Sequence, residues 1–495
     1  MSKRVLKIVL AITLVLTLVL PQTAFAEDTA SQKNIEYLKS VMDMIKEKYK
    51  GEVTDQQLIE GALKGMFNTM DKYSVFFDPK EAEEFLSDVG GKYYGIGVGV
   101  NKSDDYILIT KVFAASPAEK AGIIPGDKIV SVDGKSLIGV TIDEAVTWIK
   151  GDEGTEVTLG IIKSGQTNVT SVKLQRAEIK VSPVTYDIRN GIGYIKIESF
   201  NANTDENVSQ ALSEMDKNNI TKIVLDLRNN PGGELDQAID VARHFVPEGP
   251  ITKLDYKSDY YQDKQYNSSL KSTKYKLVLL VNKMSASASE IVAGAVQDTN
   301  AGTLVGTKTF GKSVVQTIIP MLTPEAYAKY EKKLGVKLLD AFELINKYQV
   351  QPLNSDVIGW SKITVGEYIT PKGRVINNVG LDPDVKVDDY AIVKDLDVNN
   401  IQKLTKTVKP TLGGEGIDVL NAEKILLMSG YDIDKPDTKL DAKTYNAIMK
   451  FQKDNGLSPY GVMDFSTQKA LNDKLDKLII DIDKQYTKAV EILNK

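Results

Sequence analysis

The stretch "GTKTFGKSVVQ" at residues 306–316 is compatible with two folds. Its first eight residues match the pattern G-x-x-x-x-G-K-[ST], in which a glycine-rich loop and a lysine hold the phosphates of a nucleotide at the start of a helix. Lys312 could instead accept a proton from a serine, because lysine can replace histidine as a general base. The alternatives are a nucleotide hydrolase and a protease, and the residues after Lys312 distinguish them.

These residues favour a strand rather than a helix. In "SVVQTII", at residues 313–319, five of seven residues are β-branched, and such residues are enriched in strands. A lysine at the start of a strand lacks the helix dipole that a phosphate-binding loop uses. In a strand, Lys312 and Gln316 would face the same side, with Val314 between them. We therefore favour the proton acceptor over the phosphate ligand.

Length and composition exclude several classes of protein. A chain of 495 residues with 42% hydrophobic content is too long for one ordinary domain. Its net charge of -5 gives no basic footprint, so we expect no nucleic-acid partner. It has no cysteine and one histidine, His244 in "VARHFV", which we expect to be a helix residue beside a core. Thiolate nucleophiles and metal sites built on cysteine or several histidines are excluded, and we predict no metal and no organic cofactor.

The first residues are typical of a secretory signal. Three basic residues among the first seven precede an apolar run over residues 8–20 and the small residues "AFA" at 24–26. The run is short for a membrane span, which needs roughly 20 apolar residues. We expect a signal peptide over residues 1–26 and export of the protein, with an uncleaved anchor as the alternative.

Residues 27–88 are predicted to be helical. In "NIEYLKSVMDMIKEKY" and "DQQLIEGALKGMFNTM", apolar residues recur at spacings of three and four. Thr54 is placed to cap the second helix. We expect these helices to pack or self-associate, which makes a homodimer through them a candidate assembly.

Residues 89–178 change to short strands broken by glycine. One helix, "TIDEAVTWIK", lies among them with Thr141 as its expected cap, which predicts a small β-barrel flanked by a helix. "YYGIGVGV" followed by "SPAEKAGIIPGDKIVSVDG" resembles a PDZ domain, in which a glycine-rich loop presents backbone amides to the terminal carboxylate of a peptide. The alternative is a barrel whose glycines serve only tight turns. The resemblance implies a peptide-binding loop made of Gly95, Ile96, Gly97 and Val98.

Residues 179–396 alternate strands and helices, which predicts an α/β sheet. "GIGYIKIESF", "KIVLDLRNN" and "YKLVLLVNK" are predicted strands, and "ELDQAIDVARHF" is a predicted helix. Sites in such sheets lie where strands end and loops begin, so we expect the site in the loops after Leu227 and Val281. A more polar, partly helical stretch over about 322–360 is predicted to be an insertion that covers one face of the site.

The loop after Val281 reads "NKMSASASEI" and offers three serines, Ser285, Ser287 and Ser289, where a buried strand ends and a helix begins. A serine in such a turn can expose its hydroxyl beside the free amides of the helix start. The commoner use of serine is as a cap or turn former. Local chemistry alone does not choose among the three.

Three motifs together resemble the carboxyl-terminal processing proteases, also called tail-specific proteases. They are "DLRNNPGG", "SASASE" and "TFGK" followed by a glutamine four places on, and their order matches that family over about residues 72–384. The resemblance implies Ser287 as the nucleophile, Lys312 as the general base and Gln316 as the residue that orients the lysine.

The same family uses backbone amides as its oxyanion hole, which implies Ala288 together with Gly232 or Gly233. Glycine suits this use because the backbone must approach the substrate carbonyl closely. A lysine base must be neutral, whereas the reference pKa of lysine is about 10.4. Lowering that pKa by about 3 units costs roughly 4 kcal/mol, which burial can impose. We therefore predict that Lys312 is largely buried when the enzyme is active.

Two positions depart from the family pattern. Ser313 stands where glycine usually follows the lysine, and Met284 stands where glycine often precedes the serine motif. We expect Ser313 to point away from Lys312 on a strand, so that activity is kept. In related proteases the PDZ domain gates the core, and Arg176 in "LQRAEIK" is our candidate for transmitting that change. The alternative for Arg176 is a surface or interface salt bridge.

The C-terminal part begins with a polar linker over residues 397–412. In residues 413–476, "GIDVLNAEKILLMSGYDI", "TYNAIMKFQKDNGL" and "GVMDFSTQKALNDKL" resemble a peptidoglycan-binding domain of three helices, and a last helix is expected over 477–495. The resemblance implies peptidoglycan as a partner and a place in the cell wall of a bacterium. The alternative is a helical interaction module.

These parts predict a multidomain α+β chain with a helical N-terminal segment, a PDZ-like β-barrel, an α/β protease core and a small three-helix C-terminal domain. The expected function is that of an exported serine endopeptidase that cleaves protein or peptide substrates near their free C termini, with the PDZ domain recognising the tail and gating activity. We expect an extracytoplasmic protein associated with the cell wall or membrane. The alternative is a PDZ and cell-wall-binding scaffold with an inactive protease core.

Overall fold

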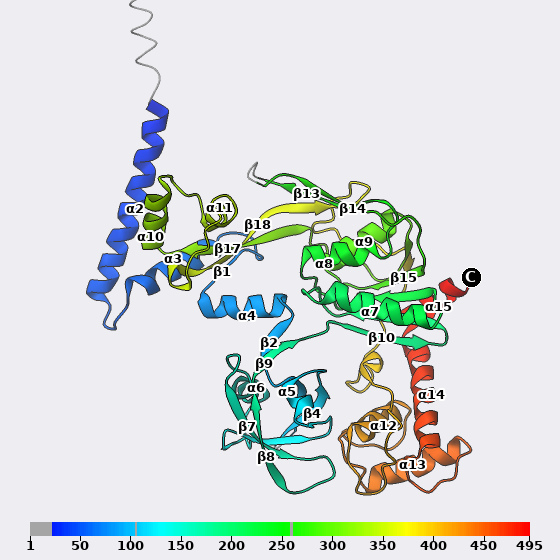
Figure 1. The fold of residues 1–495 in the computed structure, drawn as a ribbon. Coiled ribbons are helices and arrows are strands. Elements are labelled where there is room, and N and C mark those ends of the chain that lie inside the picture. Colours follow the sequence, from blue (N-terminus) through cyan, green and yellow to red (C-terminus); the bar gives the residue numbers. More distant parts are fainter. Residues whose placement is uncertain (1–21, 104–105, 258–260) are drawn as a thin grey trace, which may run out of the picture. The chain divides into compact units, whose positions relative to one another are not determined.

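The computed structural model describes residues 22–103, 106–257 and 261–495 (Figure 1). The chain divides into two compact units. The first contains residues 22–82 and Gln316–Thr364, and the second contains Glu83–Val315 and Val365–Lys495. Both units mix helices with strands, which confirms the predicted multidomain α+β class.

The first unit begins with two helices, α2 (Gln22–Lys48) and α3 (Asp55–Phe67), where the sequence predicts them. Thr54 caps α3 as predicted, because its hydroxyl accepts from the Gln57 N–H while the Gln57 side chain accepts from the Thr54 N–H. Most of the predicted signal peptide lies outside the described residues. Within the described ranges, no helix combines the length and the apolar character that crossing a membrane requires.

The predicted insertion folds into helices with a small core of its own inside the first unit. A buried cluster joins Ile319 and Leu322 to Tyr330 and Leu344. The elements around this core are β1 (Val75–Phe77), β17 (Val314–Leu322), α10 (Pro324–Leu334), α11 (Ala341–Asn346), the 3-10 helix η1 (Asn354–Asp356) and β18 (Val357–Ile369).

The second unit starts within α4 (Pro79–Val89) and contains the predicted barrel. Thr141 caps its helix α6 as predicted, by accepting from the Glu144 N–H. Strand β3 lies at one edge of the barrel's sheet, beside β4. The elements are β3 (Val98–Ser103), β4 (Tyr106–Val112), α5 (Pro117–Lys120), β5 (Lys128–Val132), β6 (Lys135–Ser136), α6 (Ile142–Ile149), β7 (Glu156–Ile162) and β8 (Val169–Gln175).

The chain enters and leaves this domain through a separate two-stranded ribbon (Figure 1). Its strands β2 (Lys92–Gly95) and β9 (Ala177–Lys180) pair antiparallel. Every covalent connection between this domain and the rest of the unit therefore passes through the ribbon.

The predicted α/β sheet has six strands in the order β10-β11-β12-β15-β16-β19, and all neighbours from β11 onwards are parallel. The strands are β10 (Val184–Arg189), β11 (Ile192–Ile197), β12 (Lys222–Asp226), β15 (Lys276–Val281), β16 (Gly302–Gly306) and β19 (Val385–Lys386). The connections contain α7 (Thr204–Lys217), α8 (Leu235–Arg243), α9 (Ala288–Asp298) and the pair β13 (Gly249–Tyr256) and β14 (Lys264–Ser268). Strand β13 also pairs with the C-terminal end of β18.

Both faces of this sheet are covered, as a parallel sheet requires. Along β15, Leu277, Leu279 and Val281 belong to the core formed with α7, α8 and α9, whereas Val278 and Leu280 belong to a second core. The second core is completed by the C-terminal segment, whose elements are η2 (Val398–Asn400), α12 (Ile417–Met428), α13 (Ala442–Asp454), α14 (Phe465–Ile482) and α15 (Lys484–Asn494).

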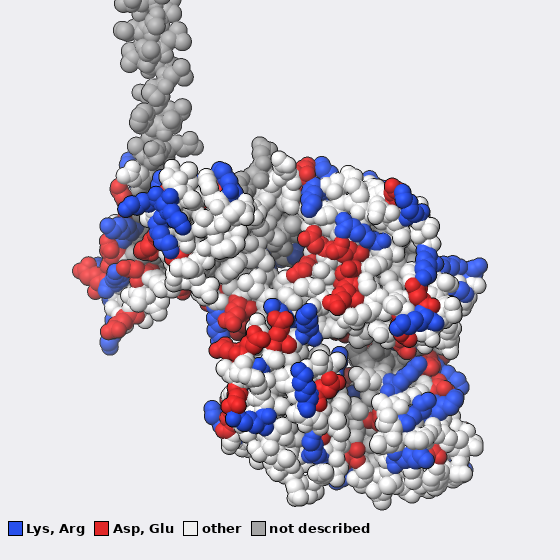
Figure 2. Space-filling view, in the orientation of Figure 1, with Lys and Arg blue, Asp and Glu red and all other residues white. Residues whose placement is uncertain are grey.

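A buried charge network joins the C-terminal segment to this sheet. The Arg228 guanidinium donates to both carboxylate oxygens of Asp483 at 2.8 Å and also to Asp226, which accepts from the Tyr194 hydroxyl at 2.6 Å. All four side chains are at least 97% buried. On the surface, the face drawn in Figure 2 mixes basic and acidic groups without a continuous basic area.

Candidate active site

Three loops of the α/β sheet carry Ser287, Lys312 and the glycines Gly232 and Gly233. They follow β12, β15 and β16, which are parallel neighbours. Because parallel neighbours end at the same edge of a sheet, these loops meet at its carboxyl edge. As predicted from the sequence, one loop starts at Leu227 after β12 and another follows Val281, the last residue of β15.

The structure distinguishes the three serines of the loop after β15. Ser285 and Ser289 are fully buried, and their hydroxyls donate to the backbone carbonyls of Leu227 at 2.8 Å and Asn230 at 3.0 Å. Both serines therefore pin the loop after β12. Ser287 is only partly buried and stands at the start of α9 with φ 54° and ψ -115°. A non-glycine residue in this region is strained by about 1–3 kcal/mol, and such strain concentrates at functional turns.

Glu290 joins the loop after β15, which carries Ser287, to the loop after β16, which carries Lys312. Its carboxylate accepts from the backbone N–H groups of Ser287 at 3.0 Å, Gly311 at 2.8 Å and Lys312 at 2.8 Å, and from the Thr309 hydroxyl. Glu290 is fully buried. Burial raises the pKa of Glu290 above its usual value, although the four donors act in the opposite direction. One carboxylate thus fixes the backbone of both segments.

Tyr368 makes a second bridge between the same two residues. Its hydroxyl lies 3.0 Å from the Ser287 carbonyl oxygen and 2.8 Å from that of Lys312. The side chain is 1% exposed, and burial raises its pKa well above the usual value. Neither Glu290 nor Tyr368 was among the predicted site residues. The spacing S-x-x-E from Ser287 to Glu290 is a capping-box signature that could have indicated the glutamate, whereas no sequence signal indicated the tyrosine.

The glycines of "NNPGG" lie directly against Ser287. A Cβ on Gly232, which has φ 105°, would come within 2.8 Å of the Ser287 Cβ. The Gly232 N–H donates to Asn230 Oδ1 at 2.8 Å. Gly233, with φ 140°, leaves no room for a side chain either, because its Cβ would lie 1.9 Å from the Phe200 carbonyl oxygen. Only glycine fits at both positions.

Lys312 lies in the turn before β17 and is partly buried. No helix follows it, so the helix that a phosphate-binding loop needs is missing. The strand β17 begins only at Val314. Lys312 is therefore not part of it, and the alternation of side chains along a strand does not place Lys312 and Gln316 on the same side. Ser313 is fully buried, with its hydroxyl 3.2 Å from Glu367 Oε2. Gln316 belongs to the other compact unit, where its amide donates to the Thr364 hydroxyl at 3.1 Å.

His244 is placed as predicted, at the end of α8 beside a core. Its Nε2 lies 2.8 Å from Asp205 Oδ1 and 3.3 Å from the Ser209 hydroxyl, both on α7. The imidazole is therefore occupied by these partners rather than by Ser287. Among the residues that the structure describes, no cluster of acidic or histidine side chains is arranged to hold a metal ion.

The predicted peptide-binding loop joins the ribbon strand β2 to the edge strand β3. Gly95 ends β2, Ile96 is buried, and Val98 begins β3. The carbonyls of Ile96 and Gly97 accept from the N–H groups of Ala118 and Phe113, which fixes the orientation of the loop's peptide groups.

Arg176 is 9% exposed and binds only groups of its own domain among the bonds that the structure gives it. Its guanidinium donates to the carbonyls of Trp148, Ile149 and Glu156 and to the Thr155 hydroxyl. These bonds hold the strand that leaves the domain against its helix α6 and strand β7.

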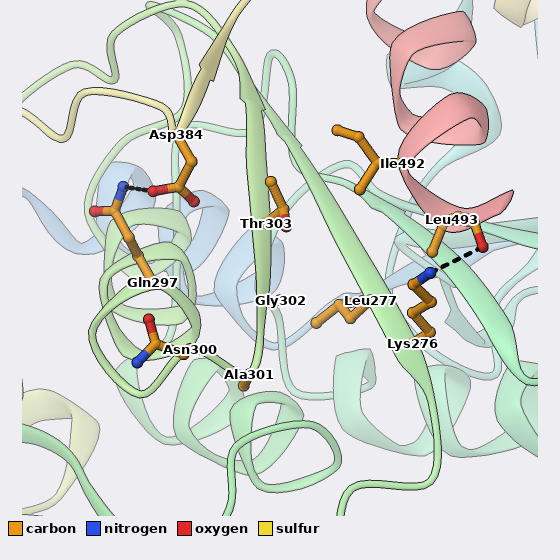
Figure 3. Close-up of a pocket in the computed structure, with 10 residues that line it drawn as sticks. All are labelled: Lys276, Leu277, Gln297, Asn300, Ala301, Gly302, Thr303, Asp384, Ile492 and Leu493. Atoms are coloured by element: carbon orange, nitrogen blue, oxygen red, sulfur yellow. Dashed lines mark hydrogen bonds between the residues drawn. The ribbon is translucent and has the colours of Figure 1, made fainter. Parts of the chain in front are cut away.

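A cavity of about 370 Å³ lies at the amino ends of the strands, opposite to the carboxyl edge that carries Ser287 (Figure 3). It is lined by the first residues of β15 and β16, including Lys276 and Gly302, and by Leu493 of α15. Lys276 donates there to the Leu493 carbonyl oxygen at 3.2 Å. The cavity is therefore separated from Ser287 by the length of the strands.

A partly exposed serine at a strained turn, a lysine on the adjoining loop and an attached PDZ-like domain are compatible with the class of PDZ-containing serine proteases. Comparisons with known families agree. Residues 191–387 match peptidase family S41, and residues 108–163 match the PDZ domain. Residues 415–471 match a peptidoglycan binding domain, and residues 19–81 match the N-terminal domain of the activating protease CtpB.

Full-length relatives show the family. Carboxy-terminal processing protease CtpA of Bacillus subtilis (strain 168) is 33% identical over 463 residues, which cover 92% of this chain and 90% of the relative. Carboxy-terminal processing protease CtpB of the same strain is 31% identical over 467 residues, with coverage of 92% and 88%. The solved photosystem II D1 C-terminal processing protease is 25% identical, with coverage of 70% and 86% and a TM-score of 0.38. The chain belongs to the carboxy-terminal processing proteases, as its motifs indicated.

Proposed function

We propose that this protease is an exported serine endopeptidase that cleaves its substrates near their C termini with a Ser287–Lys312 dyad. The observation that carries the proposal is the double bridge between these residues. Glu290 binds the N–H groups of both, and the Tyr368 hydroxyl contacts the carbonyls of both. The burial of Ser285 and Ser289 in structural hydrogen bonds supports the choice of Ser287.

In this mechanism neutral Lys312 takes the proton of the Ser287 hydroxyl as the oxygen attacks the scissile carbonyl carbon. The tetrahedral intermediate then expels the amine of the departing peptide, which receives that proton from Lys312. Water activated by Lys312 hydrolyses the remaining ester and returns the serine. Lys312 is partly buried, and a bound substrate would complete the exclusion of water that keeps a lysine neutral. On the family resemblance alone, we assign Gln316 to orienting Lys312.

The oxyanion hole is proposed to use the backbone amides of Ala288, at the start of α9, and Gly233. Gly233 is the better of the two glycine candidates because the Gly232 N–H is already bonded to Asn230 Oδ1. Two amides aimed at the developing oxyanion are the usual means of stabilising acyl-transfer intermediates.

The PDZ domain is proposed to hold the free carboxylate of the substrate through the loop of Gly95, Ile96, Gly97 and Val98. The edge position of β3, directly after this loop, supports it, because an extended peptide can add a strand there. Binding at this loop is proposed to gate the core, with Arg176 kept as a candidate for transmitting the change.

The location and the assembly are proposed from the N-terminal and C-terminal segments. The sequence of residues 1–26 supports export, and the match to a peptidoglycan binding domain supports cell-wall association in a bacterium. A homodimer through the N-terminal helices is supported by exposed apolar side chains on α2, namely Ile35, Tyr37, Leu38 and Met44.

The test compares wild type, Ser287→Ala and Lys312→Ala on unfolded substrates that end in an apolar free carboxylate or in an amide. We expect wild type alone to cleave, and to cleave the amidated substrates more slowly. Equal inertness of all three proteins across many substrates would favour a PDZ and cell-wall-binding scaffold. Equal cleavage by wild type and Ser287→Ala would contradict the assigned nucleophile.

A further inference from the structure

Residues 200–203, between β11 and α7, contact two parts of the chain. One is the loop that carries Gly232 and Gly233, called the oxyanion loop below. The other is the hinge of the PDZ domain, which we define as the residues next to the ribbon, Val89, Gly91 and Val181. At its start, Phe200 pairs with the oxyanion loop: its N–H donates to the Gly232 carbonyl at 2.9 Å, and its carbonyl accepts from the Glu234 N–H at 2.7 Å. The missing side chain of Gly233 permits this approach. The backbone position of Phe200 therefore sets that of the two glycines beside Ser287.

The next three residues hold the hinge. The Ala202 N–H donates to the Val89 carbonyl at 3.2 Å, and the Asn203 side-chain amide donates to the Gly91 carbonyl at 2.7 Å and more weakly to that of Val181 at 3.4 Å. Val89 and Gly91 lead into the ribbon strand β2, and Val181 follows β9. Both passages between the core and the PDZ domain are thus bound to this one segment.

The hinge contact is closely packed. Gly91 has φ 60°, and a Cβ there would lie 2.5 Å from the Asn201 side-chain amide. Asn201 and Asn203 are 6% and 8% exposed. The segment is also braced internally, because the Asn203 N–H donates to Asn201 Oδ1 at 3.0 Å and the Asn201 N–H donates to the Thr204 hydroxyl at 2.9 Å. A shift of the hinge cannot be absorbed inside such a segment without breaking hydrogen bonds.

The use of Asn203 is unusual for its position. It is the N-cap residue of α7, where asparagine normally turns its side chain back to cap the helix. Here it makes no side-chain capping bond. Its amide goes to the hinge carbonyls instead, which indicates that the side chain serves the hinge rather than the helix.

We propose that Asn203 is the positioning residue that couples the setting of the PDZ hinge to the oxyanion glycines. The inference rests on the proposed recognition of substrate tails by the PDZ domain. When a bound tail moves the ribbon, Asn203 carries the shift along residues 200–203 to Gly232 and Gly233. Asn203 acts by position alone, since its side-chain amide bonds to the carbonyls of Gly91 and Val181.

The experiment uses the full-length protein with Asn203→Asp. Aspartate has nearly the size and shape of asparagine, but its carboxylate cannot donate to the hinge carbonyls. The matched control is Asn218→Asp at the other end of α7, where the exposed amide bonds only to Glu214. A second variant, Gly91→Ala, disturbs the same contact from the hinge side. For each protein, kcat/KM is measured on substrates with a free and an amidated C terminus.

We expect the free-to-amidated ratio of kcat/KM to fall by about tenfold in Asn203→Asp and Gly91→Ala, the size of a typical coupling between sites, and to stay unchanged in Asn218→Asp. Affinity for a free-ended peptide, measured by fluorescence anisotropy on the inactive Ser287→Ala background, should not change. An unaltered ratio, or an equal loss with both substrates, overturns the coupling. If wild type itself shows no preference for free ends, the proposed tail recognition fails instead.

Discussion

Glu290 accepts a hydrogen bond from the backbone N–H of Lys312 at 2.8 Å, across 22 positions of sequence. The same carboxylate accepts from the Ser287 N–H at 3.0 Å. The proposed nucleophile and the proposed base are therefore held by one buried carboxyl group rather than only by their own loops. The geometry of the proposed dyad should therefore be sensitive to Glu290, which the proposed mechanism does not use.

Glu290→Gln should lower kcat by about 100-fold with little change in KM, because displacement of a catalytic group by about 1 Å costs that much. A glutamine keeps the shape, but one of its two ends is an NH2 group that cannot accept from N–H donors. Steady-state kinetics on a free-ended substrate measure the effect. Glu325→Gln, on the exposed start of α10, is the control and should be fully active. Full activity of Glu290→Gln would show that the bridge is dispensable.

Tyr368→Phe should lower kcat by about tenfold while costing about 1 kcal/mol of stability, the net value of a typical hydrogen bond. The ring continues to fill its buried space, and only the hydroxyl that contacts Ser287 and Lys312 is lost. Kinetics and denaturant unfolding are measured on the same preparation. Tyr275→Phe removes a hydroxyl bonded to Asp216 away from the site and serves as the comparison. Loss of stability without loss of rate would assign Tyr368 a structural role only.

Gly232→Ala should reduce kcat by about 100-fold, the effect of displacing a catalytic group by about 1 Å, because its methyl group would collide with the Cβ of Ser287. Gly122→Ala is the matched control. Gly122 also has a positive φ, of 68°, but open space around the missing side chain, so the variant shares the backbone strain without the collision. Comparable melting temperatures with activity lost only in Gly232→Ala would separate the site effect from strain.

The sequence predicts local features such as helix caps well and the packing between distant elements poorly. The caps Thr54 and Thr141 are found where local chemistry places them, because a cap depends on neighbours within one turn. The run "KLVLLV" indicates a buried strand, but nothing in it says that Val278 and Leu280 share a core with the C-terminal helices α12 to α15. Glu290 is visible as a capping residue, whereas its bond to Lys312 depends on how two loops meet.

The stability of the C-terminal helices should fall as pH rises from about 4.5 to about 8. Burial raises the pKa of Glu423 to about 8, and the carboxylates of Asp437 and Asp441 act in the same direction. In this range the folded chain holds a proton that the unfolded chain has released, so folding becomes less favourable with pH. Below the unfolded pKa of Glu423 its contribution is complete, and above about 8 it is lost.

Glu423→Gln mimics the protonated form and should remove this pH dependence. Between about pH 4.5 and 8, the free energy of unfolding of the variant should rise relative to that of wild type by up to about 1.4 kcal/mol for each pH unit. Urea unfolding at pH 5, 6, 7 and 8, followed by circular dichroism, measures the difference. Parallel curves for the two proteins would mean that Glu423 is ionised in the fold at neutral pH.

Arg228→Met should destabilise the protein far more than Asp483→Asn, although the two residues are direct partners. Removing the arginine leaves Asp226 and Asp483 buried without a countercharge, and breaking a buried pair in this way costs about 3–5 kcal/mol. Asp483→Asn instead leaves the neutral pair of Arg228 and Asp226, with both side chains still almost fully buried.

The same network gives the stability of the fold a pH dependence at Asp226. Burial raises its pKa, but the charge and hydrogen bonds of Arg228 outweigh burial and lower it below the usual value. Its stabilising contribution is therefore present above that usual value and is lost in acid. Denaturant unfolding of Arg228→Met and Asp483→Asn at neutral pH tests which variant loses more stability. An equal loss of unfolding free energy in the two variants would show that Arg228 does not serve as the shared countercharge of Asp226 and Asp483.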